Sequence, residues 1–205
     1  MSLPPLLLLT DRSQLRLGRA LVRTVAECAE VGLTHVVLRE LDLPDPQRAA
    51  LAAELAAAGV TVIAAHTPLA GAAGVHLPGG SCNAVSTTLL RCCNTAEDDR
   101  TPRYKGLAGR SCHTRADVTA AAADGFDYVT LGPFAAIASK PGYGPALAPE
   151  DYADHPIPVY ALGGIDPGNA EAAIEAGAHG VAVMGAVMRA ASPKSVVRDL
   201  LTVVG

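Results

Sequence analysis

Residues with the chemistry of an active site follow short apolar runs throughout this 205-residue sequence. In proteins built from parallel βα units, reactive groups lie at the carboxyl ends of strands and in the loops that follow, so such residues are predicted to converge on one rim. The positions concerned are Asp11, Arg39-Glu40, Ala65-His66, Pro78-Gly79-Gly80, Ser111-Cys112-His113, Gly132-Pro133, Gly163-Gly164 and Met184-Gly185.

His113 is the histidine best placed to move a proton. It comes just after a strand-like run, and Ser111 lies two residues before it. An imidazole changes charge near neutral pH, so this spacing predicts a catalytic proton shuttle. A histidine that caps a helix or packs against its neighbours is the structural alternative.

Two pairs of small or flexible residues predict a phosphate site. Gly163-Gly164 and Met184-Gly185 follow the seventh and eighth strand-like runs. Small residues there let backbone N–H groups approach phosphate oxygens, with help from a following helix. The alternative is that the glycines only permit tight turns.

Two cations complete the candidate site. Arg39 ends the second strand-like run, where a guanidinium can hold a carboxylate or phosphate through two contacts, unless it pairs with neighbouring Glu40. Lys140 lies in a glycine- and proline-rich segment from Ala138 to Pro145, which is predicted to be a loop that closes over a ligand. A lysine in solvent is the alternative for Lys140.

The elements that position these residues alternate along the chain. Eight short β-rich runs are separated by longer, alanine-rich amphipathic stretches, which indicates βα units on a parallel sheet. The predicted strands are Leu6–Leu9, His35–Leu38, Thr61–Ala64, Gly74–Leu77, Leu107–Gly109, Tyr128–Leu131, Val159–Leu162 and Gly180–Val183. The predicted helices are Leu15–Val31, Pro46–Ala58, Arg115–Asp124, Asn169–Ala176 and Pro193–Val203.

This count predicts a small (β/α)8 barrel, with residues 1–205 forming a single domain. An open doubly wound sheet is the competing architecture, but it normally carries a glycine-rich turn after its first strand. Here that turn reads Thr10-Asp11-Arg12-Ser13 and contains no glycine. The segment from Cys82 to Arg103 is the least regular, and its charged run at residues 97–100 is predicted to lie in solvent.

Composition excludes several classes of function. The formal charge is −4 and there is no basic run, so no nucleic-acid partner is expected. The apolar run Leu6–Leu9 is too short for a signal sequence or a membrane span, so a cytoplasmic protein without a membrane partner is expected. The five cysteines form no C-x-x-C pair, so no zinc site is expected. A homo-oligomer is neither established nor excluded.

Several strings carry a resemblance across essentially the whole chain. They are L-T-D, V-V-L-R-E, G-V-H-L-P-G-G-S, G-R-S-C-H-T, D-Y-V-T-L-G-P-F, S-K-P-G-Y-G-P-A-L, A-L-G-G-I and G-V-A-V-M-G-A-V. Together they resemble the superfamily of thiamine phosphate synthases and TenI-type thiazole tautomerases, which are small (β/α)8 barrels. The partner that this implies is a phosphorylated thiazole. The resemblance assigns phosphate binding to Gly163, Gly164, Met184 and Gly185, contacts with the ring or carboxylate to Arg39, Ser111 and Lys140, and proton transfer to His113.

The sequence departs from the synthase branch where that branch binds its second substrate. The synthase pattern implies Mg²⁺ held by two aspartates, with Gln, Lys and Asn gripping a pyrophosphate. This chain has Val37 and Leu41 where Gln and Lys are expected, Ala64-Ala65-His66 in place of I-N-D, and Pro78-Gly79-Gly80-Ser81 where the second aspartate belongs. Mg²⁺ needs such carboxylate oxygens.

The resemblance therefore points first to the tautomerase branch, whose L-P-G-x-S string this chain shares. A tautomerase isomerises a thiazole phosphate carboxylate to its aromatic form, with His113 as the proton carrier and no metal or other cofactor. Two alternatives remain open, because function depends on the site rather than the fold. They are a divergent Mg²⁺-dependent thiamine phosphate synthase and a non-catalytic binder or regulator of thiazole phosphate.

Overall fold

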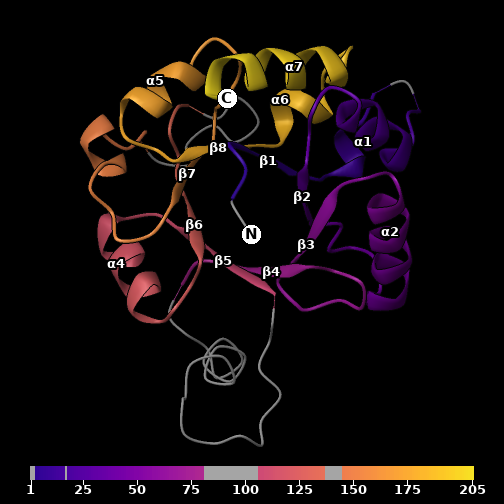
Figure 1. Cartoon of the computed structure of the whole chain (residues 1–205), viewed down its shortest axis with the longest axis horizontal. Coiled ribbons are helices and arrows are strands. Elements are labelled where there is room, and N and C mark those ends of the chain that lie inside the picture. The colour runs from indigo at the N-terminus through magenta and orange to yellow at the C-terminus, as the bar shows by residue number, and fades with distance from the viewer. Residues whose placement is uncertain (1–2, 17, 81–105, 137–144) are drawn as a thin grey trace, which may run out of the picture.

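Eight parallel strands close into a barrel in the computed structural model, which describes residues 3–16, 18–80, 106–136 and 145–205. Each strand pairs with its neighbours in chain order, and β1 closes the ring by pairing with β8, with Leu6 opposite Val181. Figure 1 looks into this ring. The strands are β1 (Leu6–Leu9), β2 (His35–Leu38), β3 (Thr61–Ala65), β4 (Gly74–Leu77), β5 (Leu107–Cys112), β6 (Tyr128–Leu131), β7 (Val159–Leu162) and β8 (Gly180–Val183).

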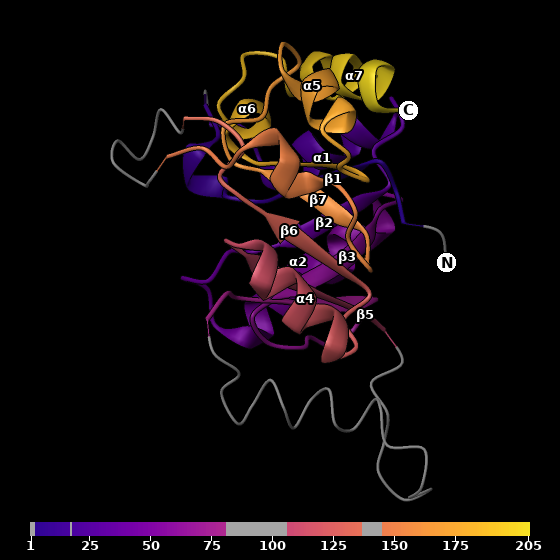
Figure 2. The same cartoon turned by 90° about the vertical axis from the view of Figure 1, so that its left-hand side faces the viewer.

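Helices surround the ring on its outside (Figure 1), and Figure 2 shows α5, α6 and α7 together at one side of the barrel and α4 at another. The α-helices are α1 (Leu21–Ala29), α2 (Asp45–Ala57), α4 (Arg115–Ala123), α5 (Ala170–Glu175), α6 (Gly185–Met188) and α7 (Pro193–Val204). Two short 3-10 helices, η1 (Arg12–Gln14) and η2 (Pro149–Tyr152), lie in connections. This arrangement confirms the predicted (β/α)8 barrel.

Three predicted boundaries are wrong in informative ways. The first helix begins at Leu21 rather than Leu15, because Gly18 has a φ of 65° and Ala20 is extended. Strand β3 continues to Ala65, and β5 continues to Cys112 instead of ending at Gly109. Ser111 therefore lies on a strand rather than in the loop after it. The segment Cys82–Arg103 and Lys140 lie outside the described residues, so the predictions for them stay untested.

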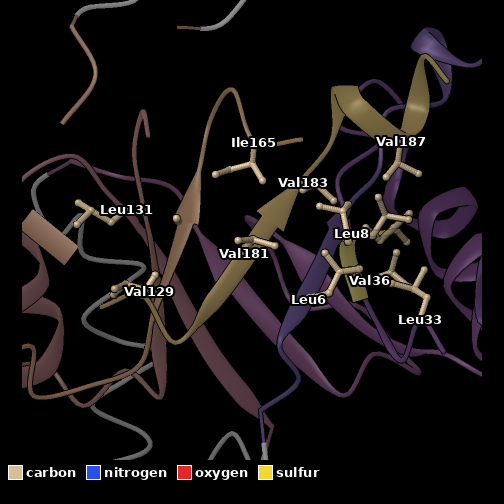
Figure 3. Packing of buried hydrophobic residues seen from close by; sticks show 14 of the residues in the cluster. Leu6, Leu8, Leu33, Val36, Val129, Leu131, Ile165, Val181, Val183 and Val187 are labelled. Carbon is tan, nitrogen blue, oxygen red and sulfur yellow. The ribbon is translucent and has the colours of Figure 1, made fainter. Parts of the chain in front are cut away.

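The core has two layers because successive side chains on a strand point to opposite faces. The outward side chains pack under the helices, and Figure 3 shows Leu6, Leu8, Val36 and Val181 on neighbouring strands with Val187 beside them. The inward side chains form a separate cluster that fills the barrel, which comprises Leu7, Leu9, Val37, Ile63, Ala65, Tyr128, Tyr160 and Ala182.

Two tyrosines fill the centre of the barrel. The rings of Tyr128 and Tyr160 meet edge to face, with centroids 5.6 Å apart, and the Tyr160 hydroxyl donates a 2.5 Å hydrogen bond to the carbonyl of Pro4. Gly109 makes room for them, because a Cβ atom there would overlap the ring of Tyr128. The barrel is thus a packed core below its rim, as expected for this architecture.

No helix among the described residues is long and apolar enough to cross a membrane.

The ring of Tyr128 occupies the space that a side chain on Gly109 would need, and this packing can be tested by substitution. We expect Gly109→Ala to lower the free energy of unfolding by about 1–3 kcal/mol, the usual cost of overpacking a filled core. Urea denaturation followed by circular dichroism measures the change. The double variant Gly109→Ala/Tyr128→Leu removes the overlapping ring atoms, so the added methyl group should cost less there than in the presence of Tyr128. Equal costs in the two backgrounds would contradict this packing.

Candidate active site

A cavity of about 510 Å³ opens at the rim formed by the carboxyl ends of the strands. Its lining combines backbone of small residues with a few polar side chains, which is the usual composition of a small-molecule site. The polar side chains that line it are Arg39, His66, Ser111, His113, Asp166 and Arg189. The site residues predicted from the sequence that are described, namely Arg39, Ser111, His113, Gly163, Gly164, Met184 and Gly185, all line this one cavity.

His113 follows β5 directly and presents its ring to the cavity. Its Nδ1 lies 3.0 Å from the carbonyl oxygen of Gly132. A carbonyl only accepts hydrogen bonds, so Nδ1 carries the proton and donates it, which leaves Nε2 of a neutral ring as the basic nitrogen. A Cβ atom on Gly79 would lie 3.3 Å from Nε2, so this glycine gives the imidazole its room.

The side chain of His113 does not cap the helix that follows it. Thr114 is the N-cap of α4 and accepts a hydrogen bond from the backbone N–H of Asp117, whose carboxylate in turn accepts from the N–H groups of His113 and Thr114. This capping box fixes the backbone on both sides of the ring. The alternative in which the imidazole caps the helix is therefore wrong. The orientation of the imidazole is fixed by the end of β5, by the capping box of α4 and by the carbonyl of Gly132 after β6.

Arg39 reaches across the rim from the end of β2. Its Nη1 lies 3.1 Å from the sulphur of Met184, while its backbone N–H donates to the Thr10 hydroxyl at 3.1 Å. Glu40 does not pair with Arg39: its carboxylate accepts from Nη1 of Arg12 at 2.7 Å and from the backbone N–H of Arg12. The predicted alternative of a salt bridge between Arg39 and Glu40 is therefore wrong, and the guanidinium faces the cavity.

Gly164, after β7, and Gly185, after β8, lie where a larger residue would overlap neighbouring atoms. Gly164 has a φ of 70°, and a Cβ atom on it would lie 2.7 Å from the carbonyl oxygen of Ala135. The tight-turn alternative thus describes Gly164 correctly, although the residue also lines the cavity. At Gly185 a Cβ atom would collide with the guanidinium of Arg189, so that cation lies against the backbone predicted to bind phosphate.

Sequence reasoning missed Arg189, Asp166 and a role for His66. Arg189 follows Gly185 by four residues, which is one helical turn, and that spacing was the available signal. Its Nη1 contacts the side-chain oxygen of Gln14. His66 was noted at the rim without a role. Its φ of 68° is unusual for a residue with a side chain, and burial, followed by the charges of Arg39 and Arg48, lowers its pKa.

Ser111 connects the cavity to a histidine inside the barrel. His76 on β4 is 5% exposed, and its Nε2 lies 3.0 Å from the Ser111 hydroxyl. Its Nδ1 lies 3.1 Å from the Tyr128 hydroxyl. Burial, with smaller contributions from His66 and Arg39, lowers the pKa of His76 to about 3. His76 is therefore neutral in the folded protein.

The described residues do not form a site for Mg²⁺. Asp166 is the one carboxylate among the described residues that line the cavity, and its Oδ1 accepts the backbone N–H of Gly168 at 2.8 Å. The described part of the chain holds no group of three or more His, Cys, Asp or Glu side chains able to bind a metal ion. Mg²⁺ takes oxygen ligands, chiefly carboxylates and phosphates. The described residues do not fit that ion.

Comparison with known proteins gives a consistent group of relatives. Residues 6–187 match the family model described as thiamine monophosphate synthase (TMP-TENI). A putative thiamine-phosphate synthase of Geobacter sulfurreducens is 36% identical over 213 residues, covering 96% of this chain and 92% of that protein. A thiamine-phosphate synthase of Thermosynechococcus vestitus is 43% identical over 100 residues, covering 46% of this chain but only 28% of its own length.

The fold has a solved counterpart. The structure of thiamine phosphate pyrophosphorylase from Pyrococcus furiosus aligns with a TM-score of 0.78 and 23% identity, covering 97% of this chain and 94% of that one. At that identity the likeness supports the barrel architecture alone.

The buried, neutral His76 predicts how stability depends on pH. The unfolded chain binds a proton at residue 76 near pH 6.5, whereas the folded protein does so only near pH 3. Between these values the unfolded state holds more protons, so stability falls as the pH falls, by about 1.4 kcal/mol per pH unit at the steepest from this residue. Urea denaturation between pH 7 and pH 4.5 should show a shallower dependence for His76→Gln. The control His155→Gln keeps the buried imidazole, and an equally shallow slope there would contradict the assignment.

Proposed function

The chain belongs to the thiamine monophosphate synthase family, and on that premise we propose that this enzyme of thiamine biosynthesis binds a phosphorylated thiazole in the rim cavity. The observation that carries the proposal is the convergence of Arg39, Arg189 and His113 with the backbone of Gly164 and Gly185 around one cavity. Guanidinium groups and backbone N–H groups bind phosphate oxygens.

The first candidate for the reaction is thiamine phosphate synthesis, a transfer to the thiazole phosphate. The names of the relatives support it, and they favour this alternative over the tautomerase that the sequence pattern placed first. In this reaction Arg39, Arg189 and the rim backbone would hold the thiazole phosphate, and Ser111 and His113 would border the reacting ring. The described residues do not fit Mg²⁺, so the roles given to them here are binding and orientation.

The second candidate is tautomerisation of a thiazole phosphate carboxylate. The geometry of His113 favours it, since a ring that donates from Nδ1 to Gly132 has a basic Nε2 beside the cavity. Nε2 would take the proton from the ring carbon that bears the carboxylate and return it to the exocyclic carbon. The thiazole becomes aromatic, and no atom is lost. Arg39 would hold the carboxylate during the transfer.

Two assays on the same preparation separate these candidates. The first incubates the protein with the non-aromatic tautomer in EDTA and then in Mg²⁺, and follows thiazole aromatisation by ultraviolet absorbance. The second supplies thiazole phosphate with the aminopyrimidine pyrophosphate and measures pyrophosphate release. Acceleration in EDTA establishes a metal-free tautomerase, whereas Mg²⁺-dependent release establishes the synthase. Thiazole phosphate binding with neither activity establishes a binder, and absence of binding rejects the proposal.

The same assays test His113. We expect His113→Ala to lower tautomerase turnover by about 10²–10⁴-fold, the usual contribution of a general acid–base, while thiazole phosphate still binds. His155→Ala is the control, because His155 lies away from the rim cavity and contacts the carbonyl of Asp151. Unchanged turnover in His113→Ala would remove His113 from the mechanism.

The role of Arg39 is tested by measuring ligand binding, without an activity assay. We expect Arg39→Ala to raise the Kd for thiazole phosphate by about tenfold or more, because charge-assisted hydrogen bonds contribute about 1.5–3 kcal/mol. Isothermal titration calorimetry measures the change. Arg23→Ala removes the same charge from an exposed position on α1 and should leave the Kd unaltered. Equal Kd values for the two variants would show that Arg39 does not contact the ligand.

A further inference from the structure

A polar chain runs through the apolar barrel interior and ends in the cavity. Tyr128 of β6, His76 of β4 and Ser111 of β5 are linked by contacts of 3.1 Å and 3.0 Å, both made by the imidazole of His76. The Thr130 hydroxyl lies 3.4 Å from Nε2 of His76, as a longer contact at the same end of the ring. Of the three linked residues, only Ser111 lines the cavity. His76 therefore meets the cavity through Ser111.

Because His76 is neutral, the hydrogen bonds of this chain run in one of two opposite directions. A neutral imidazole donates from one nitrogen and accepts at the other, whereas a charged one donates from both. Burial keeps the pKa of His76 low, and the groups whose charges add to that effect are His66 and Arg39. One nitrogen therefore accepts and the other donates.

We propose that His76 is a positioning residue that points the hydroxyl of Ser111 into the cavity as a donor toward an anionic group of the ligand. Tyr128 donates to Nδ1, Nε2–H donates to the Ser111 oxygen, and the Ser111 O–H is left to donate to the ligand. Each group in this chain donates once in the same direction, and such chains polarise one another. The opposite tautomer would turn the Ser111 proton toward His76 and present oxygen lone pairs to an anion.

The neighbours of the chain support a positioning role. Gly109 leaves space for the ring of Tyr128, and Gly79 leaves space for the ring of His113. The His76 and Tyr128 rings lie 5.5 Å apart at 31°, within a fully packed interior. Packing therefore limits the movement of both rings. A donor fixed in direction before the ligand arrives costs less to align than a freely rotating hydroxyl.

The choice of this direction rests on the proposed function, because an anionic ligand favours a donor at Ser111, but the direction itself can be measured without a ligand. Two measurements therefore test the direction of the chain and the binding of the ligand separately. The first needs no ligand and uses protein labelled with ¹⁵N at histidine, in which long-range ¹H–¹⁵N spectra identify the protonated nitrogen of each imidazole. We expect a neutral His76 with its proton on Nε2. Ser111→Ala should shift the Nε2 resonance, and Tyr128→Phe should shift that of Nδ1. A proton on Nδ1, or an Nε2 resonance unaffected by Ser111→Ala, would overturn the proposal.

The second measurement uses the aromatic thiazole phosphate carboxylate, which carries its carboxylate on the ring that Ser111 would border, and two near-isosteric variants. In His76→Gln the amide takes the place of Nε2 beside Ser111, whereas in His76→Asn it takes the place of Nδ1 beside Tyr128. We expect the Kd to rise roughly tenfold in His76→Asn and in Ser111→Ala, and by less than about threefold in His76→Gln. The His76→Asn/Ser111→Ala double variant should bind no more weakly than Ser111→Ala.

Other outcomes of the binding measurement are equally decisive. Equal losses in the Gln and Asn variants, or additive losses in the double variant, would show that His76 acts only through packing. Circular dichroism and urea denaturation confirm that each variant is folded before it is compared. If the unaltered protein binds neither thiazole phosphate nor its carboxylate, the proposed function fails, and the spectra alone then decide the direction of the chain.

Discussion

The closure of the sheet is the constraint on which the rest of this structure depends. Once β1 pairs with β8, every strand has two neighbours, and each strand residue faces either the helices or the barrel interior. Closure also brings the carboxyl ends of all eight strands to one rim. Arg39, His113, Gly164 and Gly185 are far apart in sequence, and this geometry alone places them around one cavity.

Hydrophobic periodicity accounts for how much of the fold could be predicted from the sequence. Short apolar runs, separated by helices that end at glycines, identified all eight strands, six of them with the observed bounds. The errors have local causes. Gly18, with its positive φ, separates η1 from α1, where helical periodicity suggested one long helix. Strand β5 continues beyond Gly109 to Cys112, because the polar residues Arg110 and Ser111 belong to the strand although they do not form an apolar run.

Many of the residues that line the candidate site could be predicted from the sequence, although Arg189 and Asp166 were missed, and the contacts between the residues were harder to predict. Described residues that follow strands, among them Arg39, His113 and Gly164, line one cavity, because parallel βα units bring the carboxyl ends of strands to one rim. Pairing partners were harder to foresee: Glu40 is adjacent to Arg39 in sequence but binds Arg12, twenty-eight residues away. No sequence pattern marked His76 as a functional residue, because a histidine within a strand cannot be told from any other buried residue. Its significance comes from Ser111 and Tyr128, which lie on the next two strands of the sheet and contact its ring.

The two tyrosines at the barrel centre also determine how molecules reach the cavity. Strand residues that line the cavity are Leu9, Ser111, Cys112, Leu162, Ala182 and Val183, all near carboxyl ends, and the interior below them is filled by Tyr128, Tyr160 and their apolar neighbours. In the part of the chain that the structure describes, the cavity therefore has no exit through the barrel. A ligand and the water that it displaces therefore pass each other on the rim side, and a bound molecule that leaves slowly competes directly with the next one for the same space.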